Sequence, residues 1–350
     1  MLHRLNALPD GFLTASAREL HEVLPGPTLI HLPGRRHPEL FVAVLQHGNE
    51  DVGLVAIQQV LKNLHADEGH PLPRAMSIYV GNVQAAKHGL RRLDHQPDFN
   101  RVWPGTHEHI GTAEHAMCAQ VRDIMAQRGL FASIDVHNNT GLNPHYSVVS
   151  GLDPHTLHLA LLFSRTVVWY RGTYGSMTGA FADLCPALAV ECGKPGQAAN
   201  EEAAARFIDA CLHLTAFPEQ PVQEGDVDLY HTMAVVHVAP DVDFGFGEPL
   251  AALNFDPRLD HLNFVDLPVG AVFGHTHLAA PLQAHNEAGE DVGATYFRTV
   301  DGRLTLQRAA MPSMLTLDAR VIRQDCLCYL MERVPFEFVV AARGAPAGAA

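Results

Sequence analysis

The sequence lacks the features that mark several protein classes. Its 350 residues contain no block of five or more Lys and Arg, and the formal net charge is −14 with His neutral. We therefore expect neither a nucleic acid nor an anionic membrane surface as a partner, because both attract basic patches. No apolar run reaches the roughly 18 residues that a membrane-spanning helix requires.

The N-terminus and the cysteines add two further absences. Pro9 and Asp10 interrupt the region where a signal peptide has a continuous apolar stretch. The six cysteines are scattered and do not form the pattern of a disulfide framework. We therefore expect a reduced, cytoplasmic location. Cys326 and Cys328 form a Cys-x-Cys pair, for which a strand edge is favoured over a metal site.

The chain does contain an alternation of short apolar runs and helical patterns over residues 27–215. This alternation predicts an α/β fold, with a central mixed, mostly parallel sheet flanked by helices. Strands are expected at residues 28–32, 40–45, 76–80, 131–136, 167–170 and 187–190. Helices are expected at residues 53–64, 109–128, 154–163 and 201–214.

A proline-containing segment, Phe217–Pro221, marks a change in character. The following residues show short β-like runs between Gly, Pro and Asp, with no convincing helix. Strands are expected there at residues 229–238, 270–274, 303–308 and 320–322. We predict one domain over residues 1–220 and a smaller, β-rich domain over residues 221–350, whose last residues, 345–350, fray.

The most informative stretch is Phe41–Gly53, where an apolar strand pattern ends in the sequence HGNE. In α/β proteins the carboxyl ends of strands are where chemistry is placed. His47 and Glu50 lie there, and His137 follows a second predicted strand. Two histidines and one carboxylate are typical of a catalytic zinc site, because they leave a coordination position open. We predict that these residues bind one Zn²⁺ per chain; the alternative is three unrelated polar residues in loops.

Further polar residues lie near the same predicted strand ends. Asp135 shares a strand face with His137 and is expected to orient a ligand or bound water. Glu191 lies at the mouth of the apolar run 187–190 and suits a general base. A helix-capping or salt-bridging glutamate is the alternative for this segment alone.

Two arginines suit the handling of a substrate. Arg101 offers a bidentate fork for a substrate carboxylate, and Asn100 beside it offers a second donor. A structural anchor of the loop is the alternative for this pair. Arg91 is a candidate for polarising a scissile carbonyl, although one of the adjacent residues Arg91 and Arg92 is expected to be merely solvated.

In chain order these motifs resemble a known family. The segments HGNExxG at 47–53, DxNR at 98–101, DxHN at 135–138 and VExG at 190–193 resemble the succinylglutamate desuccinylase/aspartoacylase family, within the zinc carboxypeptidase superfamily. The resemblance covers roughly residues 27–215. It implies an α/β fold with a central mixed sheet and a β-rich C-terminal domain.

The resemblance also implies an activity. It implies a zinc-dependent amide hydrolase, a deacylase that cleaves an N-acyl amino acid or a related amide bearing a carboxylate. Glu191 would activate the zinc-bound water and then protonate the leaving amine. Arg91 would polarise the acyl oxygen, and Asn100 with Arg101 would bind the substrate's carboxylate. The expected partner is this small molecule, and a homo-oligomer is compatible with the sequence.

The chain departs from the family pattern around the expected substrate pocket. Aspartoacylases carry an arginine about ten residues before the general base, where this chain has Gly179–Ala182. Arg171 is only a distant substitute. Gly289 stands where the family has a tyrosine. These departures predict a substrate other than N-acetylaspartate.

Three other functions remain open. Carboxypeptidase-like hydrolysis of short peptides would use the same residues. A metallophosphoesterase is suggested by the sequence GHTH, which contains His275 and His277, but the order of its other motifs differs from that class. A non-catalytic zinc-binding module would need neither Glu191 nor Arg101, because binding alone requires no general base.

Overall fold

The computed structural model describes residues 1–66, 70–172, 174–247 and 251–335. The chain divides into two compact units. Among the described residues, the first unit contains residues 1–138 and 145–228, and the second contains residues 139–144 and 229–335. No helix in these described ranges is both long and apolar enough to cross a membrane. The domain boundary at residue 220 stays a prediction.

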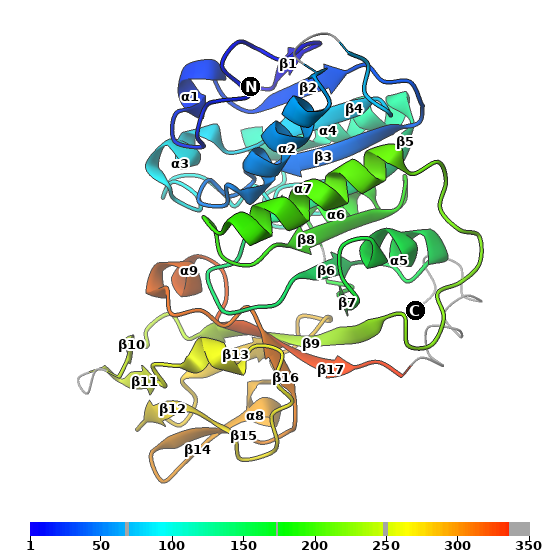
Figure 1. The fold of residues 1–350 in the computed structure, drawn as a ribbon. Helices are drawn as coiled ribbons and strands as arrows, with labels where there is room; N and C mark the ends of the chain where they lie inside the picture. Colours follow the sequence, from blue (N-terminus) through cyan, green and yellow to red (C-terminus); the bar gives the residue numbers. More distant parts are fainter. Residues whose placement is uncertain (67–69, 173, 248–250, 336–350) are drawn as a thin grey trace. The chain divides into compact units, whose positions relative to one another are not determined.

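The first unit is built on a mixed sheet whose strands run in the order β1-β2-β4-β3-β5-β8-β6-β7 (Figure 1). The strands are β1 (His3–Leu5), β2 (Thr28–Leu32), β3 (Glu39–Val44), β4 (Met76–Val80), β5 (Leu130–His137), β6 (Tyr146–Val149), β7 (Thr166–Trp169) and β8 (Ala187–Glu191). The pairs β2–β4 and β6–β8 are antiparallel, and the other neighbours are parallel. The predicted mostly parallel sheet is therefore confirmed.

Helices cover both faces of this sheet. They are α1 (Leu20–Val23), α2 (Val52–Asn63), α3 (Val83–His88), α4 (Ala113–Arg128), α5 (Pro154–Leu161), α6 (Met177–Phe181) and α7 (Ala198–His213). In Figure 1, α2 and α7 lie in front of the sheet, and α4 and α6 lie behind it. Strands that helices bury on both faces need apolar residues at successive positions. Every residue of β2, β3, β4 and β8 is accordingly buried.

Sequence signals set the start of several helices. Thr112, Asp153 and Ser176 precede α4, α5 and α6, and each side chain accepts a hydrogen bond from a backbone N–H three residues on. These caps satisfy donors that have no partner within the helix. Gly89 ends α3 in the left-handed conformation, with φ of 63°.

The second unit is rich in β-structure, as predicted. Its strands are β9 (Asp228–Val238), β10 (Phe244–Phe246), β11 (Leu253–Phe255), β12 (Val272–Thr276), β13 (Leu282–His285), β14 (Phe297–Val300), β15 (Arg303–Leu306), β16 (Met311–Ser313) and β17 (Cys328–Arg333). β9 pairs antiparallel with β13 and β17, and β17 pairs with β16. A separate sheet runs in the order β10-β11-β12-β15-β14.

Two expectations for this unit are wrong. The predicted strand at residues 320–322 lies in a helix, α9 (Ala319–Gln324). The β-branched pair in that segment favours a strand, but Asp318 accepts the N–H groups of Arg320 and Val321 and starts a helix. The expected absence of helices also fails for α8 (Gly293–Tyr296) and for the 3₁₀ helix Leu259–Leu262. The tail at residues 345–350 lies outside the described residues.

Candidate metal centre and active site

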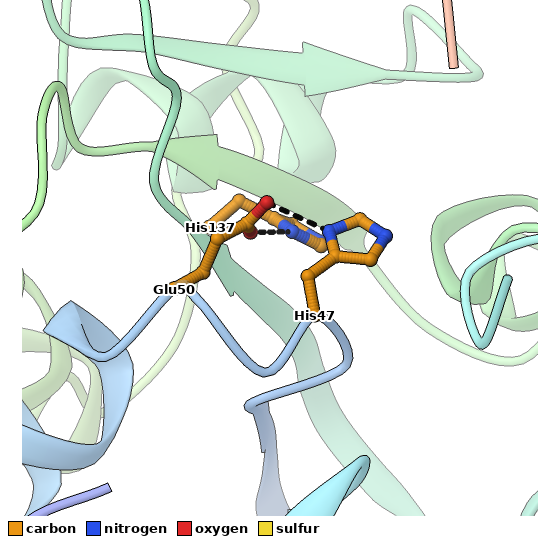
Figure 2. A group of neighbouring side chains, drawn as sticks. All are labelled: His47, Glu50 and His137. Carbon is orange, nitrogen blue, oxygen red and sulfur yellow. Dashed lines mark hydrogen bonds and ion pairs between the residues drawn. The ribbon is translucent and has the colours of Figure 1, made fainter. Parts of the chain in front are cut away.

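The candidate metal ligands meet at the carboxyl ends of β3 and β5 (Figure 2). Glu50 lies between two imidazoles: its Oε1 is 2.8 Å from His47 Nδ1 and its Oε2 is 2.7 Å from His137 Nδ1. Donor atoms of the three residues all lie within 4.8 Å of one another, and all three residues are buried. The structure thus brings the predicted ligand set together in one place.

Two glycines allow the ligand loop to pack closely. A Cβ at Gly48 would lie 2.2 Å from the backbone nitrogen of Ala86 in α3, so the loop can approach this helix only as glycine. The Gly48 N–H donates to the carbonyl of Arg91 at 3.1 Å. A Cβ at Gly53 would lie 2.8 Å from Val44, so α2 also packs closely against β3. The close packing at both positions therefore explains why the motif HGNExxG has glycine there.

A carboxylate lies on the outer side of each ligand imidazole. His47 Nε2 is 3.0 Å from Asp98 Oδ1, and His137 Nε2 is 2.8 Å from Asp135 Oδ2. A carboxylate at Nε2 favours the tautomer that carries its proton there, which leaves the Nδ1 lone pair for a metal. The contact between Asp135 and His137 supports the predicted role of Asp135 in orienting a ligand. Asp98 makes the equivalent contact with His47, and this role was not predicted from the sequence.

The charges of this buried network call for a cation. Glu50, Asp98 and Asp135 are buried carboxylates, and the guanidinium of Arg91 contacts Glu50 and Asp98. With neutral imidazoles this set is two positive charges short, and uncompensated buried charge is costly. Either two imidazolium protons or one divalent cation supplies the missing charge. The nitrogen and oxygen donors fit zinc.

Burial and neighbouring charges act in opposite directions on the ligand pKa values. Burial lowers the pKa of His137, but Asp135 and Glu50 outweigh it and hold that pKa well above its ordinary value. The pKa of His47 is raised in the same way, because Glu50 and Asp98 outweigh burial and a nearby guanidinium. Burial raises the pKa of Glu50, but the two imidazoles outweigh it, and the result is a strongly lowered pKa.

Glu191 lies beside this group. It is the last residue of β8 and the register partner of His137 on β5, so the two side chains share a face of the sheet. It is buried, and the next residue, Cys192, donates its N–H to the carbonyl of His137 at 2.9 Å. Burial raises the pKa of the Cys192 thiol, and the charges of Glu191 and Glu50 raise it further. The two carboxylates therefore both act on this thiol.

Arg91 is held by Asp98. Its Nε and Nη2 lie 3.0 and 2.9 Å from Asp98 Oδ2, and its Nη1 lies 3.6 Å from Glu50 Oε1. Burial raises the pKa of Asp98, but Arg91 and His47 outweigh it and hold that pKa well below its ordinary value. Arg91 thus supports the candidate ligand His47 through Asp98. Its predicted role in polarising the scissile carbonyl stays a prediction.

Asn100 and Arg101 lie in the loop that also carries Asp98. The amide of Asn100 is buried: Nδ2 donates to Asp135 Oδ2 at 3.0 Å, and Oδ1 accepts the N–H of Met177 at 2.9 Å. Arg101 is half-buried, and its Nη1 donates to the carbonyl of Asn100 at 2.9 Å. Their roles in binding a substrate carboxylate stay predictions.

Three further residues shape the site without having been assigned a role from the sequence. Asn138 donates to the carbonyl of Gly193 at 2.9 Å and accepts the N–H of Val52 at 3.0 Å, so it ties the start of α2 to the loop after Glu191. Of the other two, Gln46 donates to Asp135 Oδ2, and Trp103 donates to Gln46 Oε1. The position of Asn138 beside His137 in the DxHN motif was the available signal.

The phosphoesterase alternative was suggested by the two histidines of the GHTH sequence. His275 and His277 are exposed residues of the second unit and are not members of the candidate ligand group. His275 lies on β12, paired in register with Asn254 and Arg303.

Comparisons with known proteins agree with the motifs. Residues 37–165 match the model of the succinylglutamate desuccinylase/aspartoacylase catalytic domain. The resemblance predicted from the sequence is thereby confirmed, and the match indicates a hydrolase of the deacylase type. No curated protein matches the sequence.

Solved structures show the same fold. Succinylglutamate desuccinylase from Vibrio parahaemolyticus is 15% identical, with 88% of this chain and 86% of that chain covered and a TM-score of 0.58. A succinylglutamate desuccinylase/aspartoacylase from Rhodobacter sphaeroides is 18% identical, with coverages of 87% and 88% and a TM-score of 0.55. Murine aminoacylase 3 is 16% identical, with coverages of 85% and 97% and a TM-score of 0.53. At these identities the likeness concerns the fold.

Proposed function

We propose that the protein is a zinc-dependent amide hydrolase that cleaves N-acyl amino acids or related amides bearing a carboxylate. The observation that carries the proposal is the buried group of His47, Glu50 and His137, with Glu191 beside it on the next strand. Three protein ligands leave a coordination position for water or substrate, which is typical of catalytic rather than structural zinc. The family match over residues 37–165 supports the reaction class.

The zinc would supply the Lewis acid of the site, since a bound Zn²⁺ lowers the pKa of water and polarises a carbonyl. His47, Glu50 and His137 would hold it, with Asp98 and Asp135 fixing the two imidazoles from behind. The missing positive charge of the buried network is the structural reason to expect a divalent cation there.

Glu191 is the proton carrier in this proposal. Its carboxylate accepts a proton from the attacking water and delivers it to the leaving nitrogen, so the amine departs in neutral form. Its place at the end of β8 holds this carboxylate on the same sheet face as His137.

Arg101 is the substrate anchor in this proposal. A guanidinium binds a carboxylate through two parallel hydrogen bonds, which fixes the direction of the bound substrate as well as its position. Its neighbour Asn100 is predicted to be a second donor. An anchored carboxylate would set the amide carbonyl at one distance from Glu191, which favours reaction by restricting orientation.

The test combines metal analysis with a substrate screen. N-acyl amino acids with several acyl groups are compared with dipeptides that have a free C-terminus and with C-terminally amidated forms of both. We expect one zinc per chain and hydrolysis of a carboxylate-bearing amide, with the amidated form cleaved poorly. Dipeptide cleavage alone would favour the carboxypeptidase-like alternative. Stoichiometric zinc without any hydrolysis would favour the alternative of a non-catalytic zinc-binding module.

A further inference from the structure

We infer that Gln46 is a positioning residue that fixes the metal ligand His137 through Asp135. This inference rests on the proposed metal site. Gln46 follows β3 directly before His47 and Gly48 of the ligand loop, and only 1% of its surface is exposed. Its Nε2 lies 2.5 Å from Asp135 Oδ2, so a residue next to one ligand contacts the carboxylate that holds another.

The orientation of the Gln46 amide is set by Trp103. The indole Nε1 of Trp103 lies 2.6 Å from Gln46 Oε1, and an indole N–H can only donate. The amide oxygen must therefore face Trp103, and the amide NH₂ must face Asp135. Asp135 accepts this hydrogen bond and, in turn, the Nε2–H of His137 at 2.8 Å. The chain Trp103–Gln46–Asp135–His137 has one direction: Nε2 of His137 donates to Asp135, and Nδ1 would be the atom that binds a metal.

Asp135 depends on this hydrogen bond more than a typical carboxylate does. It is fully buried, its Oδ2 accepts from Gln46, Asn100 and His137, and its Oδ1 has no hydrogen-bond partner. Its hydrogen-bond partners are two neutral amides and one imidazole. A buried anion with all of its donors on one oxygen is held in one rotamer by those donors.

The matching carboxylate, Asp98, is held differently. It takes two contacts of 3.0 and 2.9 Å from the guanidinium of Arg91, a charged group. His47 therefore has an ion pair behind it, whereas His137 has a carboxylate whose orientation is set by amides. Loss of the Gln46 amide should consequently affect the metal site through His137 while the contacts of His47 remain.

The experiment measures metal affinity rather than catalysis. Zn²⁺ binding is followed by competition with a chromophoric chelator, and Co²⁺ binding by its visible absorption spectrum. Gln46→Met keeps the length of the side chain and removes both polar atoms. We expect its zinc dissociation constant to rise about 10–100-fold, the usual range for loss of a partner behind a metal ligand. The Co²⁺ spectrum should change as well.

A matched control lies on the same strand as Asp135. Ser133 is also fully buried on β5, two residues away, and its Oγ has no hydrogen-bond partner. Ser133→Ala should leave zinc affinity within about threefold of the parent, because no contact to the metal site is lost. Circular dichroism and thermal unfolding of each variant check that the fold is kept. If Gln46→Met does not fold, Gln46→Glu, which has the same shape, takes its place.

A double-mutant cycle separates positioning from a general packing effect. Trp103→Phe alone should weaken zinc binding, since it removes the donor that orients the amide. Combined with Gln46→Met, it should weaken zinc binding no further. Wild-type affinity in the Gln46 variants, or full additivity in the cycle, would overturn the inference and leave the proposed function standing. Absence of zinc binding by the wild type would overturn both.

Discussion

His137 and Glu191 are register partners on the neighbouring parallel strands β5 and β8, and each is the last residue of its strand. Neighbouring strands lie about 4.8 Å apart, and paired residues share a face. A candidate metal ligand and a candidate proton acceptor are therefore held together by the sheet itself. Loops need only bring His47 and Glu50 to that point.

The first prediction concerns this pair. Glu191→Gln keeps the shape of the side chain but removes its capacity to accept a proton. We expect kcat to fall by about 10²–10⁴-fold, the usual contribution of general acid–base catalysis. The zinc content should stay at the wild-type level, because Glu191 is not one of the candidate ligands. Steady-state kinetics and metal analysis on the same preparations measure both quantities.

Glu224→Gln is the control for this prediction. Glu224 is exposed and lies far along the chain from the ligand segments, so its neutralisation should leave kcat unchanged. A near-normal rate of the Glu191→Gln enzyme would show that Glu191 is not the proton carrier.

The second prediction tests the substrate anchor. Arg101→Ala should raise KM for carboxylate-bearing amides by about 10–100-fold, because one charge-assisted, bidentate contact is lost. Arg101→Lys keeps the charge but not the bidentate fork, so its KM should lie between those of the wild type and of Arg101→Ala. Both variants are also assayed on C-terminally amidated substrates. Equal losses on amidated and free substrates would show that Arg101 does not read the carboxylate.

The third prediction concerns the metal itself. Removal of metal by a chelator should abolish activity, and Zn²⁺ should restore it. Mg²⁺ and Ca²⁺ should not, because both prefer oxygen ligands, whereas two of the three candidate donors are imidazole nitrogens. The measurement is activity after dialysis and readdition of each ion. Recovery with Mg²⁺ alone would contradict the assignment of the donor set.

The strands of the first unit could be predicted well from the sequence. β2 (Thr28–Leu32) and β4 (Met76–Val80) have the predicted bounds, because strands buried on both faces appear as continuous apolar runs bounded by polar or turn residues. The short elements were harder to predict. Residues 320–322 have the composition of a strand, but they form a helix because the side chain of Asp318 caps its first turn.

The candidate ligands could be predicted because each follows a recognisable strand. The residues behind them could not, since their roles depend on contacts far apart in sequence. Gln46 meets Asp135 across 89 positions and Trp103 across 57. No local pattern encodes such a pairing. The same holds for Asp98, whose contact to His47 spans 51 positions.

The fourth prediction tests the packing of the ligand loop. Gly48→Ala would place a Cβ 2.2 Å from the backbone nitrogen of Ala86 and 2.4 Å from the carbonyl carbon of Ala85. Neither backbone atom can move away cheaply, so the loop must shift. We expect a loss of about 1–3 kcal/mol in the free energy of unfolding, together with weaker zinc binding. Urea unfolding and chelator competition measure the two effects.

Gly151→Ala is the matched control for this substitution. A Cβ at Gly151 would meet its nearest neighbour, a carboxylate oxygen of Asp153, at 3.9 Å, an ordinary contact. Stability and zinc affinity should therefore stay close to wild type. Unchanged zinc binding in Gly48→Ala would mean that the loop tolerates the shift.

The last prediction concerns pH and stability at His31. This residue of β2 is 5% exposed; its Nδ1 lies 2.7 Å from Ser77 Oγ, and its Nε2 has no hydrogen-bond partner. Burial lowers its pKa, the charges of Arg128 and Arg4 act in the same direction, and Glu39 opposes them. Because the pKa is lower in the folded state than in the unfolded state, protonation favours unfolding. Stability from neutral His31 is present above the unfolded pKa of about 6.5 and is lost as pH falls below it.

His31→Gln removes this titration while keeping a polar side chain. Urea unfolding at pH 7.5 and pH 5.5 should show a larger loss of stability for the wild type than for the variant. One group can contribute at most about 1.4 kcal/mol per pH unit to that difference. The other histidines are common to both proteins, so the difference between the two slopes isolates His31. Equal slopes would mean that His31 keeps an ordinary pKa in the folded protein.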